Sequence, residues 1–374
     1  MSIEISRLDT GEKVSRDPKT LGWDINDASR GAHEHYMLKE ILEQPGCIRK
    51  ALEQDHEHIM EIALEILRTK NVMFTACGTS RHAALVGRYI FSKVGGKFCE
   101  VVMASEFQYF SESIDRNTLV IAVSQSGETA DVMEGVKKAK AHGAKILSIV
   151  NVTDSSLARL ADYVIYTNCG PEIGVAATKS FTNQLIVFYL LAFAMMNRLE
   201  EVTEKIKEIS YIVSDEIEKT HAHIKEIAEK TLNEKDFYYI GRGINFAIAS
   251  EGALKIKEIS YVHAEGMPAG ELKHGTIALI DRNTPVIAIC PKDHSFQETL
   301  SNAIETKSRG AYVIGVSDES NQVFDDVMKI PDVDEIFYPL VTIIPLQIFA
   351  YYSATLRGKN PDKPRNLAKS VTVK

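Results

Sequence analysis

LVIAVSQSGET, residues 119–129, joins a short run of apolar, mostly β-branched residues to a loop of glycine and hydroxyl residues. Similar apolar runs occur at residues 72–76, 146–150 and 163–166, and helix-length stretches separate them. Short apolar runs that alternate with helices are typical of a parallel sheet covered on both faces. The sequence therefore predicts an α/β lobe built around these four strands.

The same order of features returns further along the chain. Gly78, Thr118 and Gly143 align with Gly241, Thr284 and Gly310, at nearly constant spacing. A spacing conserved over three landmarks indicates an internal duplication. We therefore expect two lobes, at residues 71–200 and 226–358, joined by a linker helix at 201–225. Residues 23–70 are expected to hold a linker and N-terminal helices, 1–22 a short hairpin, and 359–374 a C-terminal tail.

The composition limits the classes of partner. The 374 residues carry a formal charge of −8, which offers no broad cationic surface to a nucleic acid or an anionic membrane. Five cysteines without a CxxC spacing favour a reducing compartment over a disulfide framework or a zinc ribbon. The apolar run Leu185–Met196 is shorter than the roughly 20 residues that span a bilayer, so we interpret it as a buried helix. A cytoplasmic location is expected.

Two loops that follow strands are candidates for an anion site. Residues 77–80 and 124–129 place hydroxyl groups and free N–H groups at the carboxyl edge of the predicted sheet, where open α/β sheets bind ligands. The simpler alternative is that these residues only cap helices. In the second half the matching loop reads Cys290-Pro291-Lys292-Asp293, so only the first half keeps the hydroxyl groups. The loop residues are Cys77, Gly78, Thr79, Ser80, Ser124, Gln125, Ser126 and Thr129.

A nucleotide site is weakly supported. No GxxxxGK[ST] motif is present, and Gly241-Arg242-Gly243 lacks the third glycine of a dinucleotide fingerprint. The loops also lack a lysine directed at phosphates, which fits a monophosphate better than a triphosphate. We therefore predict that the first lobe binds a monophosphate.

Ionisable residues are densest in the second half. Glu251, Lys255 and Glu258 share one face of a predicted helix, which could be a catalytic group or a solvated salt-bridge face. Glu258 is our candidate base, because a carboxylate in partly apolar surroundings can carry a proton near neutral pH. His274 could serve as an acid or base in opening a sugar ring, although a lone loop histidine is more often structural. The paired histidines near residues 33, 56 and 221 lack the spacing of a metal site.

A set of motifs in fixed order resembles one family. CGTS, ASEF, SQSGETAD, GVAATK, EGALKIKEISYVHAE, GELKHG and the terminal RNLAKSVTV are similar to the sugar isomerase half of the glutamine:fructose-6-phosphate aminotransferases. The resemblance runs from about residue 23 to the end of the chain. It implies two tandem flavodoxin-like, three-layer α/β/α sugar isomerase domains, and substrates at the level of fructose 6-phosphate and glucosamine 6-phosphate. Neither a metal nor an organic cofactor is implied.

The resemblance also implies roles for individual residues. Lys369 would form a Schiff base with the ketone, and Glu258 would move a proton between C1 and C2. His274 would assist ring opening, reaching a partner subunit in a homodimer, while Glu251 and Lys255 would support the site. The loop residues with hydroxyl groups, together with Gln125, would bind the phosphate. Further contacts are expected from Val175, Ala177 and Ala368, although Ala177 stands where similar sequences often carry serine.

One departure from the family and two rival functions leave alternatives open. The hairpin resembles the end of a glutaminase domain that this chain lacks, so the ammonia would come from outside it. The rival enzyme is a fructosamine 6-phosphate deglycase, which runs carbon–nitrogen chemistry in the opposite direction. A non-catalytic phosphosugar sensor would need the loops but neither Glu258 nor Lys369. The tail could be a disordered terminus, but Leu367 and Val371 beside Lys369 favour docking.

Overall fold

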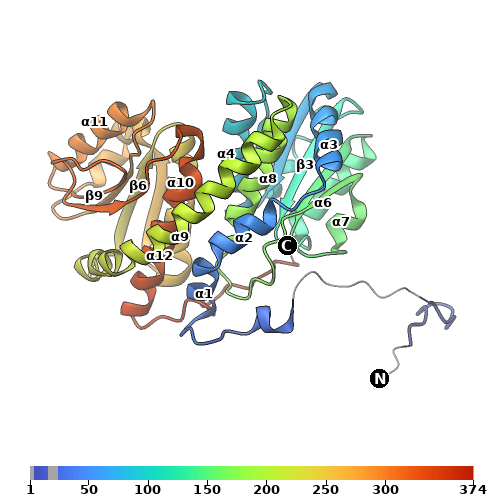
Figure 1. Cartoon of the computed structure of the whole chain (residues 1–374), viewed down its shortest axis with the longest axis horizontal. Helices are drawn as coiled ribbons and strands as arrows, with labels where there is room; N and C mark the ends of the chain where they lie inside the picture. Colours follow the sequence, from blue (N-terminus) through green and yellow to red (C-terminus); the bar gives the residue numbers. More distant parts are fainter. Residues whose placement is uncertain (1–3, 16–23, 374) are drawn as a thin grey trace.

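The computed structural model describes residues 4–15 and 24–373. Two lobes, each with a five-stranded parallel sheet, lie side by side (Figure 1). The first sheet has the order β2-β1-β3-β4-β5 and the second the order β10-β9-β8-β6-β7. Numbered within its own lobe, each sheet has the flavodoxin-like order 2-1-3-4-5. The predicted fold class and the internal duplication are confirmed.

The strands are short and their residues alternate between two helical layers. They are β1 (Asn71–Ala76), β2 (Glu100–Met103), β3 (Thr118–Ser124), β4 (Lys145–Val150), β5 (Tyr163–Tyr166), β6 (Asp236–Gly241), β7 (His263–Pro268), β8 (Pro285–Ile289), β9 (Tyr312–Ser317) and β10 (Asp326–Lys329). In β3, Leu119 and Ile121 face one core while Val120 faces another. Four strands of the first lobe were predicted. β2 was missed because it is a four-residue edge strand with exposed ends.

The helices cover both faces of each sheet. The α-helices are α1 (Tyr36–Leu42), α2 (Gln44–Ala51), α3 (His56–Arg68), α4 (Gly78–Lys93), α5 (Ala104–Phe107), α6 (Ala130–Ala141), α7 (Ser156–Leu160), α8 (Lys179–Met195), α9 (Leu199–Lys230), α10 (Ile244–Ser260), α11 (Phe296–Lys307) and α12 (Tyr338–Leu356). Short 3-10 helices are η1 (Ile25–Ala28), η2 (Ser111–Ser113), η3 (Ala269–His274), η4 (Thr276–Leu279) and η5 (Glu335–Phe337).

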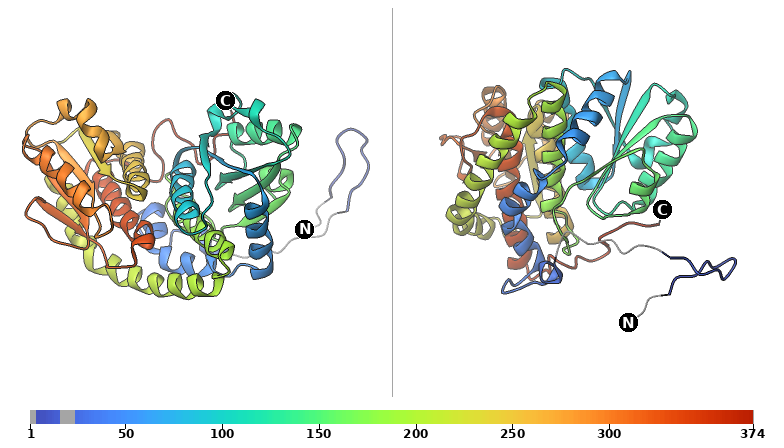
Figure 2. Two further views of the ribbon diagram at one scale, coloured as in Figure 1. Left: turned by 90° about the horizontal axis from the view of Figure 1, so that it is seen from above. Right: turned by 45° about the vertical axis from the view of Figure 1, so that its right-hand side comes forward.

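One hydrophobic core extends through both lobes. It contains residues from α8 of the first lobe, from α10 and α12 of the second, and from α9 between them. The region expected to be a linker helix at 201–225 belongs to α9, a 32-residue helix whose apolar face is buried in this core. Figure 2 shows α9 running along both lobes. The lobes are therefore packed against each other through shared helices.

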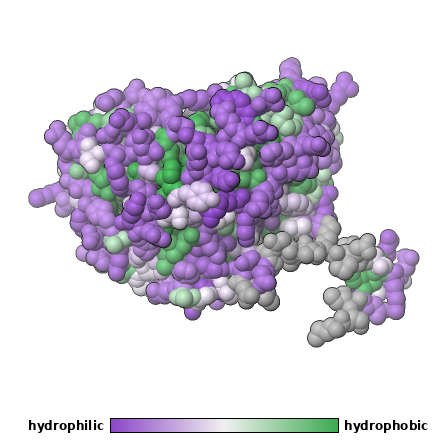
Figure 3. Space-filling view, viewed as in Figure 1, coloured by the Kyte–Doolittle hydropathy of each residue, from purple (hydrophilic) through white to green (hydrophobic). Residues whose placement is uncertain are grey.

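The longest apolar segments lie inside this core. Every residue of α8 is buried, which confirms Leu185–Met195 as a buried helix, while Met196 at the end of the predicted run is 50% exposed. Among the described residues, one helix, Glu335–Leu356, is apolar and long enough to cross a membrane. In its apolar 18-residue stretch, 89% is buried inside the protein. A core helix explains that burial. Figure 3 shows mainly hydrophilic residues on the visible face.

The structure corrects one detail of the repeat, the glycine of the second lobe that corresponds to Gly78. β1 and β6 each have six residues and start 165 residues apart, so Gly78 corresponds to Gly243 and the predicted match to Gly241 is wrong. Both glycines have positive φ, +49° and +56°, at the turn from strand to helix.

The predicted hairpin near the start of the chain is present, with Ser6 paired to Lys13 in antiparallel orientation and Gly11 in the turn at φ +69°.

Candidate active site

The loop after β3 is held open by its own hydroxyl groups. Ser124 Oγ lies 3.0 Å from Thr129 Oγ1 and accepts a hydrogen bond from the Gly127 N–H at 3.1 Å. Ser126 Oγ accepts the Glu128 N–H at 3.3 Å. Thr129 is the N-cap residue of α6, but its side chain makes no capping hydrogen bond. The Thr129 hydroxyl therefore has Ser124 as its partner and does not cap α6, so it could also donate to an anion at the positive end of that helix dipole.

Gly127 is required by its surroundings. Its φ is +65°, and a Cβ atom there would lie 2.1 Å from Ser155 Oγ. The loop is fixed further by the neighbouring loop after β4, since the Asn151 N–H donates to the Gln125 carbonyl at 3.0 Å. A rigid loop of this kind pre-organises its donors for a small ligand.

The loop after β1 joins the first lobe to helix α10 of the second. Thr79 Oγ1 donates to Glu251 Oε1 at 2.9 Å and accepts from Lys255 Nζ at 2.9 Å. Ser80 is buried and accepts a hydrogen bond from Gln184 at 2.9 Å. Thr79 and Ser80 therefore already have protein partners, and Thr79 connects the loop after β1, one of the two candidate phosphate loops, to α10. Cys77 is the N-cap residue of α4, and burial raises the pKa of its thiol to about 11.

Glu251, Lys255 and Glu258 form one network on α10, and they are not on a solvated face. The side chains of Glu251 and Lys255 are fully buried, and Glu258 is 22% exposed. Lys255 Nζ lies 2.7 Å from Glu258 Oε2 and 3.3 Å from Glu251 Oε1. The alternative interpretation of these residues as a solvated salt-bridge face is wrong. Of these three side chains, only that of Glu258 is accessible from the surface.

The charges of this network stabilise one another. Burial alone would raise the pKa of Glu251, but the ammonium of Lys255 and hydrogen bonds from His82 and Thr79 lower that pKa below its usual value. Burial alone would lower the pKa of Lys255, and the carboxylates of Glu251 and Glu258 instead raise it. Lys255 is therefore a permanent cation next to Glu258.

His82 is a member of this network that the sequence analysis did not identify. Its Nδ1 lies 2.8 Å from Glu251 Oε2, and its side chain is 12% exposed. His82 follows Thr79 by three residues in α4, so both side chains lie on one face of that helix. That helical spacing is the signal that could have indicated it.

The C-terminal tail is docked on the first lobe (Figure 1), where it contacts the loop after β3, residues 124–129. Ser370 Oγ donates to Ser126 Oγ at 3.1 Å, and the Ala130 N–H donates to the Val371 carbonyl at 3.1 Å. The predicted docking is confirmed, but the expected reason is wrong. Leu367 and Val371 are 46% and 55% exposed, so polar and backbone contacts hold the tail.

Lys369 is held by an acidic pocket that the sequence analysis missed. Its Nζ donates to Glu172 Oε2 at 2.6 Å and to the Gly174 carbonyl at 2.8 Å. Burial alone would raise the pKa of Glu172, but the charge and hydrogen bond of Lys369 and the N–H groups of Thr178 and Ser180 lower it to about 2. A carboxylate just before a helix was the available sequence signal, since Glu172 accepts the first N–H groups of α8.

The remaining predicted residues lie in two places. Ala368 belongs to the tail, and the Val175 N–H donates to the Asp362 carbonyl of the tail at 3.3 Å, while Ala177 directly precedes Thr178, the N-cap residue of α8. His274 ends η3 and is exposed, and within the described residues no hydrogen bond or ion pair connects it to Glu258 or the phosphate loops. One chain therefore brings together the loops, α10 and the tail, but not His274.

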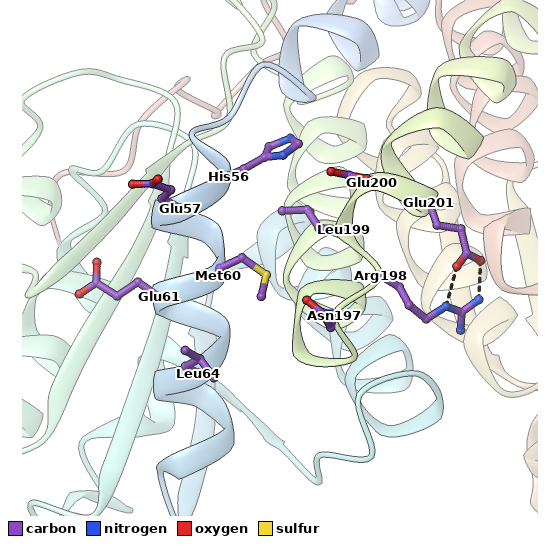
Figure 4. Close-up of a pocket in the computed structure, with 10 residues that line it drawn as sticks. All are labelled: His56, Glu57, Met60, Glu61, Leu64, Asn197, Arg198, Leu199, Glu200 and Glu201. Atoms are coloured by element: carbon purple, nitrogen blue, oxygen red, sulfur yellow. Dashed lines mark hydrogen bonds and ion pairs between the residues drawn. The ribbon is translucent and has the colours of Figure 1, made fainter.

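Other features add no candidate site. A groove between α3 and the start of α9 is lined by the ten residues shown in Figure 4, where Arg198 is paired with Glu201. None of the predicted site residues lines it. In the part of the chain that the structure describes, no group of three or more His, Cys, Asp or Glu side chains could hold a metal ion.

Comparison with known proteins agrees with this arrangement. The SIS domain matches residues 65–194 and 230–357. Two curated proteins named glutamine–fructose-6-phosphate aminotransferase (isomerizing) are similar over nearly the whole chain. The protein from Thermococcus kodakarensis is 47% identical over 100% of this chain and 64% of its own length, and the protein from Pyrococcus horikoshii is 44% identical over 99% and 63%. The chain thus spans less than two thirds of either relative.

A solved structure covers the same region. The C-terminal domain of glucosamine-fructose-6-phosphate aminotransferase from Francisella tularensis is 36% identical, with a TM-score of 0.83. The match covers 90% of this chain and 100% of that domain. The resemblance in sequence therefore extends to the arrangement of both lobes.

Proposed function

Because the chain belongs to the SIS domain family and matches the whole C-terminal domain of an aminotransferase, we propose that it is an isomerase unit acting on fructose 6-phosphate. One observation carries this proposal. The tail with Lys369 is hydrogen bonded to the same loop, through Ser126, that presents hydroxyl groups to a phosphate. A lysine amine and a phosphate site next to each other suit an open-chain ketose phosphate.

The first chemical step uses the lysine. The phosphate binds to the loops of the first lobe, at Ser124, Gln125, Ser126 and Thr129 with Thr79 and Ser80 beneath them. The ammonium of Lys369 first gives its proton to water, the resulting amine attacks the C2 carbonyl carbon, a carbon–nitrogen bond forms, and the carbonyl oxygen leaves as water. Ammonia then displaces the lysine and forms a new imine at C2. Ammonia would come from a glutaminase domain in a longer protein or from solution.

The second step moves a proton. Glu258 removes a proton from C1 and returns it to C2, which converts the ketose imine into glucosamine 6-phosphate. The same transfer through an enediol converts fructose 6-phosphate itself into glucose 6-phosphate. Lys255, 2.7 Å from Glu258, fixes the orientation of the carboxylate. Proton transfer by a positioned side chain contributes about 10² to 10⁴ in rate.

The assay follows both products from fructose 6-phosphate, with and without ammonium salt, with chelator present. The parent chain is expected to form glucose 6-phosphate alone and glucosamine 6-phosphate when ammonium is added. Glu258→Gln should lose both products, and Lys369→Ala should lose the ammonium-dependent one. Parent rates in both variants would refute the proposal. Binding without turnover in the parent would favour a phosphosugar sensor.

We also infer a cytoplasmic homodimer in which His274 acts on the partner's site. The exposed position of His274 supports this, as do five free thiols for the compartment. The test mixes a His274→Asn chain with a Glu258→Gln chain after subunit exchange. Mixed dimers would contain one complete site, so an equal mixture should recover about a quarter of the parent activity. No recovery from two folded variants would contradict action across the dimer.

A further inference from the structure

The side chain of Lys369 is fixed by its acidic pocket far more than by the rest of the tail. The tail around it has no helix or strand, and its apolar side chains at Leu367 and Val371 are exposed. Nζ of Lys369 instead has two short contacts, to the Glu172 carboxylate and to the Gly174 carbonyl, at 2.6 Å and 2.8 Å. The location of the amine is therefore decided by the loop between β5 and α8.

Glu172 is itself immobilised. The carboxylate is completely buried, and its Oε1 accepts the N–H groups of Thr178 and Ser180 at 2.9 Å and 3.0 Å. Its Oε2 accepts the Ser180 hydroxyl at 2.8 Å as well as Lys369. A buried charge with four donors has one orientation, so it can act as a fixed reference point for the lysine.

A second carboxylate fixes the other contact of Lys369. Glu40 Oε1 accepts the N–H groups of Ile173 and Gly174, so it fixes the two peptides that lead up to the Gly174 carbonyl, which accepts from Lys369. There is no spare room, since a Cβ atom at Gly174 would lie 2.9 Å from Glu40 Oε2. Glu40 and Glu172, from different parts of the chain, thus define one pocket for a single amine.

We propose that Glu172 is the positioning residue for Lys369, and that Glu40 supports it by fixing the 173–174 peptide. This proposal rests on the role of Lys369 under the proposed function and deepens it. Held by Glu172, the amine stays beside the phosphate loop and needs only a short movement to reach a bound ketone. Without Glu172 the rest of the tail stays docked through its other contacts, but the amine keeps only the uncharged Gly174 carbonyl as a partner and samples more positions.

The experiment traps the imine directly. Fructose 6-phosphate and sodium borohydride are added to the whole chain, and the rate at which Lys369 becomes covalently labelled is followed by mass spectrometry of the tail peptide. Glu172→Gln keeps an oxygen that can accept from Thr178 and Ser180 but removes the charge facing Lys369. Labelling is expected to slow by roughly ten- to a hundredfold, because misplacing a reacting group by about 1 Å can cost a hundredfold.

Matched measurements separate positioning from a structural role. Binding of fructose 6-phosphate to the Glu172→Gln variant should change less than about twofold, since the phosphate loop is untouched. Glu43→Gln is the control, because Glu43 is paired with Lys39 and Lys179, not with Lys369, and it should label at the parent rate. Glu172→Asp keeps the negative charge but holds it further from Lys369, so this variant should be labelled at an intermediate rate. It replaces Glu172→Gln in the test if that variant does not fold.

The outcomes distinguish the two proposals. If the parent chain is not labelled at Lys369, the proposed function is wrong. If the parent is labelled and the folded Glu172 variants are labelled equally fast, the positioning role is wrong and the function stands. Slow labelling together with an equal loss of substrate binding would also overturn the positioning role, because it would indicate a general collapse of the site.

Discussion

The two lobes have the same strand order, but the loops that follow their third strands, β3 and β8, carry different side chains. β3 and β8 start 167 residues apart, as do β4 and β9, and this register pairs Ser126 with Asp293. Asp293 accepts from Asn245 at 2.7 Å and from the N–H and hydroxyl of Ser295, each at 2.8 Å. In the second lobe a carboxylate of the protein takes the donors that a phosphate could take. In the first lobe hydroxyl groups leave that place open.

The difference suggests how a duplicated fold could divide the proposed reaction between its two lobes. The first lobe provides the loops, while the second lobe provides α10 with Glu251, Lys255 and Glu258. Thr79 is hydrogen bonded to two of these three residues and connects the lobes. Four sets of variants test this comparison. They change Glu258 on α10, Lys255 between the lobes, the loops after β3 and β8, and Glu40 near the tail.

The largest effect is expected from the second lobe's proton carrier. Glu258→Gln keeps an acceptor for Lys255 but cannot take a proton, so kcat should fall by about 10² to 10⁴. The substrate's KM should change little, because the phosphate is bound by the other lobe. Steady-state kinetics measures both. Lys257→Gln, an exposed neighbour on α10, is the matched control and should keep the parent kcat.

Breaking the connection between the lobes should cost stability. Lys255→Met removes the cation that balances two carboxylates and leaves buried Glu251 with only His82 and Thr79 as partners, so the free energy of unfolding should fall by about 3 to 5 kcal/mol. Urea denaturation gives the value. Lys205→Met removes a lysine paired with Asp334 on the surface and should have a much smaller effect. Equal effects of the two variants would mean that the buried network does not join the lobes.

Making the loop after β3 resemble the loop after β8 should abolish the difference in phosphate binding that we expect between the two lobes. Ser126→Asp places a carboxylate where a phosphate should bind, so affinity for fructose 6-phosphate should fall by about a hundredfold through like-charge repulsion. Asp293→Ser makes the opposite change and should leave affinity within about twofold of the parent. Calorimetric titration measures both, and the reverse ranking would contradict the assignment.

The smallest effect concerns the acid beneath the tail. Burial first, and then the charge of Glu172, raise the pKa of Glu40 from 4.5 to about 7. A raised carboxyl pKa gives stability that is complete below about pH 4.5 and is lost as pH rises through 7. Glu40→Gln should therefore be more stable than the parent by roughly 1 to 3 kcal/mol at about pH 8, and equal to it near pH 4.5. A gain at both pH values would contradict this.

The parts of the fold that were predicted are those with a local signal. Strands such as β3 are continuous apolar runs, and the loop motif follows them directly. The pairing of Glu251, Lys255 and Glu258 was also visible, since helical spacing is local. Whether that face met solvent or another lobe depended on tertiary packing, which no local pattern contains.

The acidic pocket shows the limit most clearly. Glu40, Glu172 and Lys369 are 132 and 197 residues apart along the chain, and nothing in their neighbours indicates that they meet. The tail carried a misleading signal, because Leu367 and Val371 suggested apolar docking while hydrogen bonds hold it. A polar contact depends on a few atoms in one geometry, so it is harder to predict than a buried apolar face.

Titration of the whole chain with fructose 6-phosphate in a calorimeter tests the central claim most directly, because it counts binding sites. If the first lobe binds the phosphate and Asp293 fills the equivalent place in the second, one molecule should bind per chain, and Ser126→Asp should remove that binding. Two molecules per chain, or one molecule whose binding survives Ser126→Asp but is lost when the second lobe's loop is altered, would contradict the division of labour between the lobes.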